Sequence, residues 1–225
     1  MADQLDAIEI ETAAAPGASI IWMHGLGADG HDFVNVVPEL RLPARPGVRF
    51  VFPHAPMRPV TINGGYVMRA WYDIRDDHGE RREDAAGVRA SQKAIEALIQ
   101  REKERGVPAA AVVLAGFSQG GAMALHTGLR HAERLAGVMA LSCSLPLADT
   151  LAAEAAPANH AVPIFMAHGA HDPMIPMARA LRAREVLTGR GYRVEWHEYP
   201  MPHSVCAEEI ADISAWLGKV LGARP

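Results

Sequence analysis

A mostly parallel β-sheet covered by helices on both faces is the fold class that this sequence predicts. Short apolar runs alternate with longer segments of helical periodicity, which is typical of α/β folds. The runs are almost continuously apolar, as expected of parallel strands that are buried on both faces. The chain has 225 residues, a length that one such domain can reach. We therefore expect a single domain over residues 1–225.

Six short apolar runs, each bounded by turn residues, are the predicted strands. Because they recur along the whole chain, we expect them to pair in one sheet. They span 19–23 (SIIWM), 48–52 (VRFVF), 111–115 (AVVLA), 138–141 (VMAL), 164–167 (IFMA) and 193–198 (RVEWHE).

Two stretches carry apolar residues at helical spacing with charges on the opposite face. The first spans 84–105 and stops before Gly106 and Pro108, residues that end helices. The second is the last helix of the chain. Between the second and third strands, residues 54–80 show no clear period, and an aperiodic segment of this length is usually a functional loop or disordered. The apolar stripes consist of Val88, Ile95, Leu98 and Ile99 in the first helix, and of Ile210, Ile213, Leu217 and Leu221 in the last.

Charge and composition indicate which kinds of binding partner and which cellular compartment to expect. The net charge is −4, so no basic excess favours nucleic acid or an anionic membrane surface. The N-terminus lacks the basic and apolar regions of a signal peptide, and no apolar run approaches the roughly 20 residues of a membrane span. Cys143 and Cys206 are too few for a disulfide framework. We expect a cytoplasmic protein without stable membrane insertion.

The stretch GFSQG, residues 116–120, carries the first chemical signal. It places Ser118 between glycines where a predicted strand runs into a helix, the context of a nucleophile elbow. Small neighbours relieve crowding at such a turn, and the helix N-terminus directs free N–H groups at the reaction centre. The alternative is a glycine-rich turn whose serine has no function.

A nucleophilic serine needs a base, an orienting acid and donors for an oxyanion. Asp172 follows the strand predicted at 164–167, and His203 follows the one at 193–198, in the order Ser, Asp, His that such folds use. The strand at 19–23 ends in HGLG, residues 24–27, where a backbone N–H can face the turn. The N–H of Gln119 is the second expected donor.

Nearby histidines and aspartates allow other assignments. His168 and His171 with Asp172 could hold a metal, but two histidines three apart on a loop are a weak ligand set, and we expect none. His168 is expected to hydrogen-bond within the acid loop, and His24 to shape the oxyanion loop. Asp73, Asp76 and Asp77 precede the serine, whereas the expected acid follows it.

Six segments together resemble one family. They read HGLGADGHDF, PHAPMRPVTINGGYVMRAWYDI, GFSQGGAMAL, LAGVMALSCSLP, HGAHDPMIP and MPHSV. In this order, over residues 19–221, they are similar to the carboxylesterase/acyl-protein thioesterase (lysophospholipase-like) family of α/β hydrolases. Pro202 departs from the pattern, because that position is expected to hold a small or flexible residue.

The resemblance implies an α/β-hydrolase fold with a minimal lid and a catalytic triad of Ser118, Asp172 and His203. It implies an oxyanion hole from the N–H groups of Leu26 and Gln119, and a position for Trp71 beside the substrate cleft. It also implies a small cytoplasmic hydrolase that works without metal or cofactor, often as a homodimer.

The expected function is hydrolysis of carboxylic esters with short-to-medium acyl chains through an acyl-enzyme. Acyl-protein thioesterase and lysophospholipase activities are the alternatives, so the expected substrate is a small ester or an acylated protein. An inactive hydrolase-fold binding protein is the alternative from another class. The apolar residues of the segment 54–78, Trp71 and Met68 among them, are expected to form the acyl wall together with Leu26; the alternative is that they cover the core.

Overall fold

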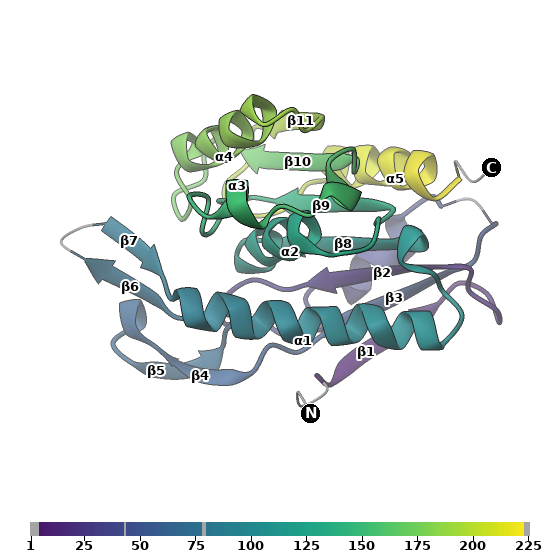
Figure 1. Cartoon of the computed structure of the whole chain (residues 1–225), viewed down its shortest axis with the longest axis horizontal. Helices are drawn as coiled ribbons and strands as arrows, with labels where there is room; N and C mark the ends of the chain where they lie inside the picture. Colours follow the sequence, from purple (N-terminus) through teal and green to yellow (C-terminus); the bar gives the residue numbers. More distant parts are fainter. Residues whose placement is uncertain (1–4, 43, 78–79, 223–225) are drawn as a thin grey trace.

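A seven-stranded sheet forms the centre of the computed structural model, which describes residues 5–42, 44–77 and 80–222. All strands of this sheet run parallel except β1, which pairs antiparallel with β3. The six predicted strands are all present. In spatial order the strands are β1 (Ala7–Glu11), β3 (Val48–Pro53), β2 (Ala18–Met23), β8 (Val112–Phe117), β9 (Gly137–Leu141), β10 (Ile164–Gly169) and β11 (Val194–Tyr199) (Figure 1).

Helices cover both faces of this sheet, as the sequence predicts (Figure 1). Helices α1 (Ala85–Glu104) and α2 (Gln119–Arg130) lie on one face, and α5 (Ala207–Gly222) lies on the other with the 3-10 helix η1 (Val34–Glu39). No helix in the described ranges is long and apolar enough to cross a membrane. The remaining helices are α3 (Leu151–Glu154), α4 (Met177–Gly189), η2 (Thr61–Asn63), η3 (Ala109–Ala111) and η4 (Pro157–Asn159).

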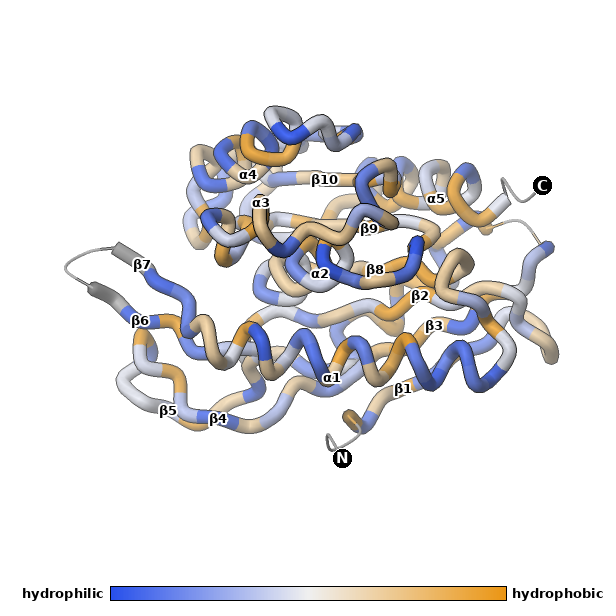
Figure 2. Tube along the Cα trace, viewed as in Figure 1, coloured by the Kyte–Doolittle hydropathy of each residue, from blue (hydrophilic) through white to orange (hydrophobic). Residues whose placement is uncertain are grey.

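Helix α1 illustrates how local sequence sets an element. It begins after Asp84, whose carboxylate accepts the N–H of Gly87 at 3.1 Å, and so satisfies one of the free donors of the first turn. Its predicted apolar stripe is buried against the sheet and α2, and Figure 2 shows apolar and polar bands alternating along it. Gly106 follows with a φ of 91°, a conformation that glycine adopts without strain.

Strand β1 was not predicted from the sequence. It is the five-residue stretch AIEIE, whose alternation suits an edge strand with one face on the core. Ile8 and Ile10 pair with Phe52 and Phe50 of β3. The short alternating run is a signal that sequence reasoning could have used.

The expectation of one irregular loop over residues 54–78 is wrong for its described part. The segment forms a hairpin of β4 (Met57–Val60) and β5 (Tyr66–Arg69), and then β6 (Ile74–Asp77), which pairs with β7 (Glu80–Glu83). These strands have four residues each and pair only within their hairpins. Because they do not enter the buried sheet, no continuous apolar run marks them.

A buried carboxyl at the start of α5 makes the stability of the fold depend on pH. Glu209 is 0% exposed, and burial raises its pKa from 4.5 to about 8. Between these two pH values the unfolded chain has lost this proton and the folded chain keeps it. The free energy of unfolding therefore falls as pH rises through this window, by up to ~1.4 kcal/mol per pH unit from this group.

We expect Glu209→Gln to remove this contribution, because the amide does not ionise. Urea unfolding at pH 5 and pH 8 measures it: the wild type should lose more stability between the two pH values than the variant. Glu208→Gln is the matched control, since Glu208 is exposed in the same helical turn. An equal pH dependence in wild type and Glu209→Gln would contradict the expectation.

Candidate active site

Ser118 lies on the tight turn between β8 and α2, with φ 54° and ψ −119°. A non-glycine residue at positive φ carries strain of order 1–3 kcal/mol and persists only where its surroundings impose it. Two contacts impose it here, since the Ser118 N–H donates to Leu141 O at 2.8 Å and its carbonyl accepts the Ala122 N–H at 3.0 Å. The turn sets the side chain at the start of α2, whose first N–H groups are free.

The glycines around Ser118 are required by close backbone approach. A Cβ on Gly116 would lie 2.2 Å from the carbonyl carbon of Gly120, and a Cβ on Gly120 would lie 2.2 Å from Met23 O. Real Cβ atoms do not approach backbone so closely. The spacing of glycines in GFSQG is therefore explained by the packing of β8, α2 and β2 around the turn.

Asp172 follows β10 and its carboxylate is fully engaged. Oδ1 accepts the N–H groups of Met174 and Ile175, both at 2.8 Å. Oδ2 lies 2.6 Å from Nδ1 of His203 and 3.5 Å from Nε2 of His168. All four of these neighbouring nitrogen atoms are hydrogen-bond donors, so together they hold the Asp172 carboxylate in one orientation.

His203 follows β11 and is positioned by packing as well as by Asp172. Its ring packs at a tilt of 43° against Phe117, the residue before the serine, at a centroid distance of 4.6 Å. Its loop passes so close to β10 that a Cβ on Gly169 would lie 2.3 Å from Pro202 O. Since Nδ1 donates to Asp172, Nε2 is left to accept a proton.

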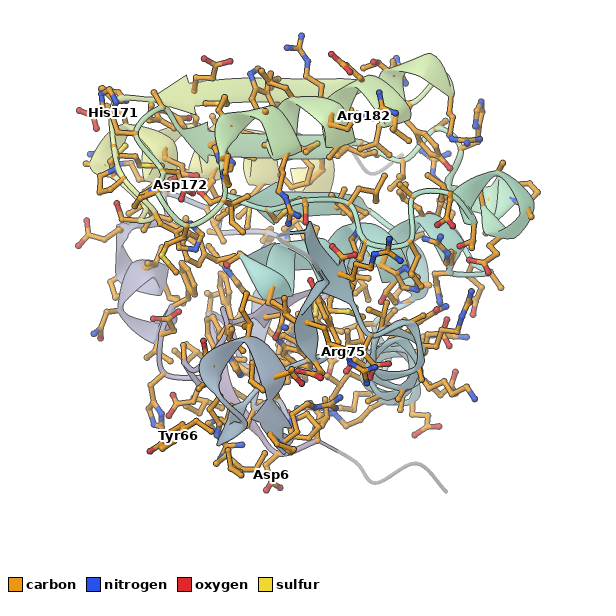
Figure 3. The ribbon with its side chains drawn as sticks, turned by 90° about the vertical axis from the view of Figure 1, so that its left-hand side faces the viewer. Asp6, Tyr66, Arg75, His171, Asp172 and Arg182 are labelled. Atoms are coloured by element: carbon orange, nitrogen blue, oxygen red, sulfur yellow. The ribbon has the colours of Figure 1, made fainter. Side chains whose placement is uncertain are left out.

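One cavity of about 300 Å³ joins these groups at the edge of the sheet where β2, β8, β9, β10 and β11 end. Figure 3 views the molecule from this side and labels Asp172 on the loop after β10. Both Ser118 and His203 line the cavity, as do Leu26 and Gln119. Its largely apolar wall includes Tyr72, Ile74, Phe117, Ala122, Cys143, Met174 and Ile175.

The prediction that Trp71 and Met68 border the cleft is wrong. Trp71 is 0% exposed and hydrogen-bonds beneath the cleft, with its indole N–H donating to His24 O at 2.9 Å. Met68 is half-buried beside Gly27, and its sulfur accepts the Asn63 amide at 3.4 Å. Neither residue lines the cavity, so the alternative of core packing describes Trp71 better.

Sequence reasoning missed most of the residues that form the wall. Met174 and Ile175 lie two and three residues after Asp172, and their apolar character beside a candidate catalytic residue is a signal that the sequence offers. Cys143 follows β9 at the same edge of the sheet. Burial raises the pKa of the Cys143 thiol to about 12, so it contributes an apolar surface rather than a thiolate.

A metal site at His168 and His171, and an acid role for Asp73, fit the structure less well. His168 donates from Nε2 to Ile175 O at 2.9 Å, which confirms its expected role within the acid loop. His171 is exposed, and no group of three or more His, Cys, Asp or Glu in the described residues is arranged to hold a metal ion. Asp73 accepts the N–H and hydroxyl of Thr61 and does not line the cavity.

Chemically, the arrangement provides a hydroxyl, an imidazole and a carboxyl group in the order that nucleophilic catalysis uses. The hydroxyl lies on a strained turn at a helix N-terminus, and the imidazole is oriented by a buried carboxylate. A largely apolar cavity, lined also by Asp32, Glu83 and Arg179, adjoins them, and its apolar part suits an acyl group.

Comparison with known proteins agrees with this chemistry. Residues 6–221 match the family described as Phospholipase/Carboxylesterase. The chain is 40% identical over 213 residues to acyl-protein thioesterase 1 of Gibberella zeae, covering 91% of each chain. It is 41% identical over 218 residues to the protein of the same name from Neurospora crassa, covering 92% of this chain and 89% of that one.

Among solved structures, acyl-protein thioesterase 2 of Zea mays superposes with a TM-score of 0.83 at 28% identity, covering 96% of this chain and 99% of that one. The match to the family extends over nearly the whole described chain. This chain therefore belongs to the phospholipase/carboxylesterase family, and it is a serine esterase or thioesterase with the α/β-hydrolase fold.

Proposed function

We propose that this protein hydrolyses acyl esters and thioesters through an acyl-enzyme on Ser118, with His203 as base and Asp172 as the orienting acid. The observation that carries the proposal is the 2.6 Å contact between Asp172 and His203, in a site whose cavity also contains Ser118 on its strained turn. Aligned strand ends bring the three residues together from positions far apart in the sequence.

The reaction begins when Nε2 of His203 takes the proton of Ser118 as Oγ bonds to the acyl carbonyl carbon. The carbonyl oxygen becomes an oxyanion, which accepts the backbone N–H groups of Leu26 and Gln119. The intermediate collapses, the bond to the leaving group breaks, and His203 gives its proton to the departing alcohol or thiol. Water, activated by the same imidazole, attacks the acyl-enzyme and releases the acid.

S-acylated proteins are the second candidate substrate, favoured by the relatives. Both fungal proteins that share about two fifths of their residues with this chain are named acyl-protein thioesterases. A cytoplasmic location and a homodimer stay predictions of the sequence.

The test is a pair of substrates with one acyl chain, offered once as an oxygen ester and once as an S-acylated cysteine peptide. Labelling of Ser118 by a fluorophosphonate, located by peptide mass spectrometry, checks the nucleophile independently. Higher kcat/KM on the S-acyl peptide supports the thioesterase assignment, and higher kcat/KM on small esters supports the carboxylesterase assignment. Absence of labelling and of turnover would support the inactive binding protein instead.

We expect the apolar cavity to set the acyl-chain preference. Ile74→Phe should shift the optimum toward shorter chains, because the larger ring takes space that a chain would occupy. Each methylene that no longer fits costs about 0.8 kcal/mol, or about four-fold in kcat/KM. The measurement is kcat/KM over a series of 4-nitrophenyl esters.

Val67→Phe is the control for this prediction. Val67 is 52% exposed on β5 and lies outside the cavity lining, so its variant should keep the wild-type profile. An unchanged profile in Ile74→Phe would show that the acyl chain lies elsewhere.

A further inference from the structure

A buried hydrogen-bond chain fixes the protonation of His24, next to the oxyanion loop. Nε2 of His24 accepts the N–H of Ala55 at 3.0 Å, so this nitrogen carries no proton. Nδ1 therefore carries it and donates to Gly25 O at 2.7 Å. His24 is 1% exposed, and burial lowers its pKa to about 4, which keeps the ring neutral at neutral pH.

The bond from His24 to Gly25 O also fixes the direction of the next N–H. In a trans peptide unit the carbonyl and the N–H point in opposite directions. Gly25 O is held toward the buried imidazole, so the N–H of Leu26 in the same unit points away from it. Gly25 and Leu26 both line the cavity, and a Cβ on Gly25 would lie 3.4 Å from Ser118 Cβ.

Trp71 connects the loop after β2 to Gln119, whose backbone N–H is the second expected donor. Its indole N–H donates to His24 O at 2.9 Å, and its backbone N–H donates to Oε1 of Gln119 at 2.7 Å. The other end of the Gln119 amide donates from Nε2 to Tyr72 O at 2.8 Å. Both polar atoms of the Gln119 side chain are thus bonded, and the backbone N–H of this residue is the first of α2.

Ser91 of α1 secures Trp71 from the other side, with its hydroxyl bonded to Trp71 O. The Trp71 side chain also contacts the His24 ring, with centroids 5.4 Å apart. The loop after β2 and the start of α2 are therefore joined by one residue from the segment between the two hairpins.

We propose that Trp71 and His24 are positioning residues that hold the N–H groups of Leu26 and Gln119 in place for the oxyanion. This proposal rests on the function proposed above. Donors that are fixed before the reaction stabilise charge in the transition state without reorganising. Loosening them should slow the chemical step and leave binding of the uncharged substrate almost unchanged.

Trp71→Phe tests the proposal, because it removes the indole N–H and retains an aromatic ring. Loss of one oxyanion donor costs about 10²–10³ in kcat, and a donor that is displaced rather than lost should cost about 10–100-fold. We expect that fall in kcat with KM within about two-fold of wild type.

Trp22→Phe is the matched control. Trp22 lies on β2, is 1% exposed, and its indole nitrogen has no hydrogen-bond partner among the described residues. The two variants lose the same atoms from the same core, so both report the cost of lost packing. Only Trp71→Phe should lower kcat, and urea unfolding of both variants checks that each remains folded under the assay conditions.

Gln119→Met provides a second variant, because it removes both amide contacts and keeps the backbone N–H. A trifluoromethyl ketone inhibitor provides a second measurement, since its adduct with the serine carries an oxyanion. Its affinity should fall in Trp71→Phe and Gln119→Met by about the same factor as kcat/KM, and stay unchanged in Trp22→Phe.

Equal kcat in Trp71→Phe and Trp22→Phe, or inhibitor affinity that does not follow kcat/KM, would overturn the proposal. If the function proposed above were wrong, the result would differ, because Ser118→Ala would then retain turnover. An inactive Ser118→Ala variant together with an unaffected Trp71→Phe variant would refute the positioning role alone.

Discussion

Replacing Ser118 with alanine is expected to lower kcat by about 10⁴–10⁶, because removal of a triad nucleophile closes the acyl-enzyme route. The fold should remain, since the turn is held by backbone hydrogen bonds to Leu141 and Ala122 and by the close approach of Gly116 and Gly120. The measurement is turnover of a 4-nitrophenyl ester by purified wild type and variant, with thermal unfolding recorded for both.

Ser144→Ala is the matched control, because Ser144 lines the same cavity and lies after β9 rather than on the strained turn. Its activity should stay within a few-fold of wild type. If Ser118→Ala kept more than about a tenth of wild-type activity, far above the residual rate left by loss of a nucleophile, another residue would be the nucleophile.

Asp172→Asn is expected to lower kcat by about 10⁴ with little loss of stability. Oδ1 of Asp172 accepts two backbone N–H groups, so the oxygen of the new amide should occupy that position. The amide nitrogen then replaces Oδ2, which lies 2.6 Å from Nδ1 of His203. A donor at that point favours the tautomer with the proton on Nε2, which cannot accept the serine proton.

Asp73→Asn is the control for the acid. Asp73 also accepts a backbone N–H and a hydroxyl, both from Thr61, but it has no contact with His203. A severe loss of activity in Asp73→Asn together with a mild loss in Asp172→Asn would show that the acid has been assigned to the wrong residue. The steady-state kcat of the two variants, measured side by side, decides between them.

Local sequence patterns were enough for the framework of the fold. The buried strands are almost continuous apolar runs, and α1 begins at a capping aspartate and ends before a glycine. Strand β1 and the hairpins of β4–β5 and β6–β7 were not found, because short strands at an edge or outside the sheet need no apolar run. The sequence carried a weak signal for β1 in its alternating stretch AIEIE.

The position of Trp71 shows where sequence reasoning fails. Tryptophan in an aperiodic segment suggests either a substrate wall or a core residue, and the segment itself has no period that decides which face is buried. The two N–H groups of Trp71 donate to His24, which lies 47 residues away in the sequence, and to Gln119, which lies 48 away. Contacts over such separations arise from the folded chain, so no local pattern records them.

The sequence by itself determined which strand ends carry Ser118, Asp172 and His203, and in what order. This was possible because parallel strands place their carboxyl ends on one edge of the sheet, and because a turn as tight as GFSQG admits only glycine at two positions. Only the tertiary structure decided which oxygen of Asp172 meets His203, which residues line the cavity, and that Trp71 is bonded to the loop after β2. These features depend on hydrogen bonds and packing between segments far apart in the chain, whose geometry is set when the whole sheet and its helices come together.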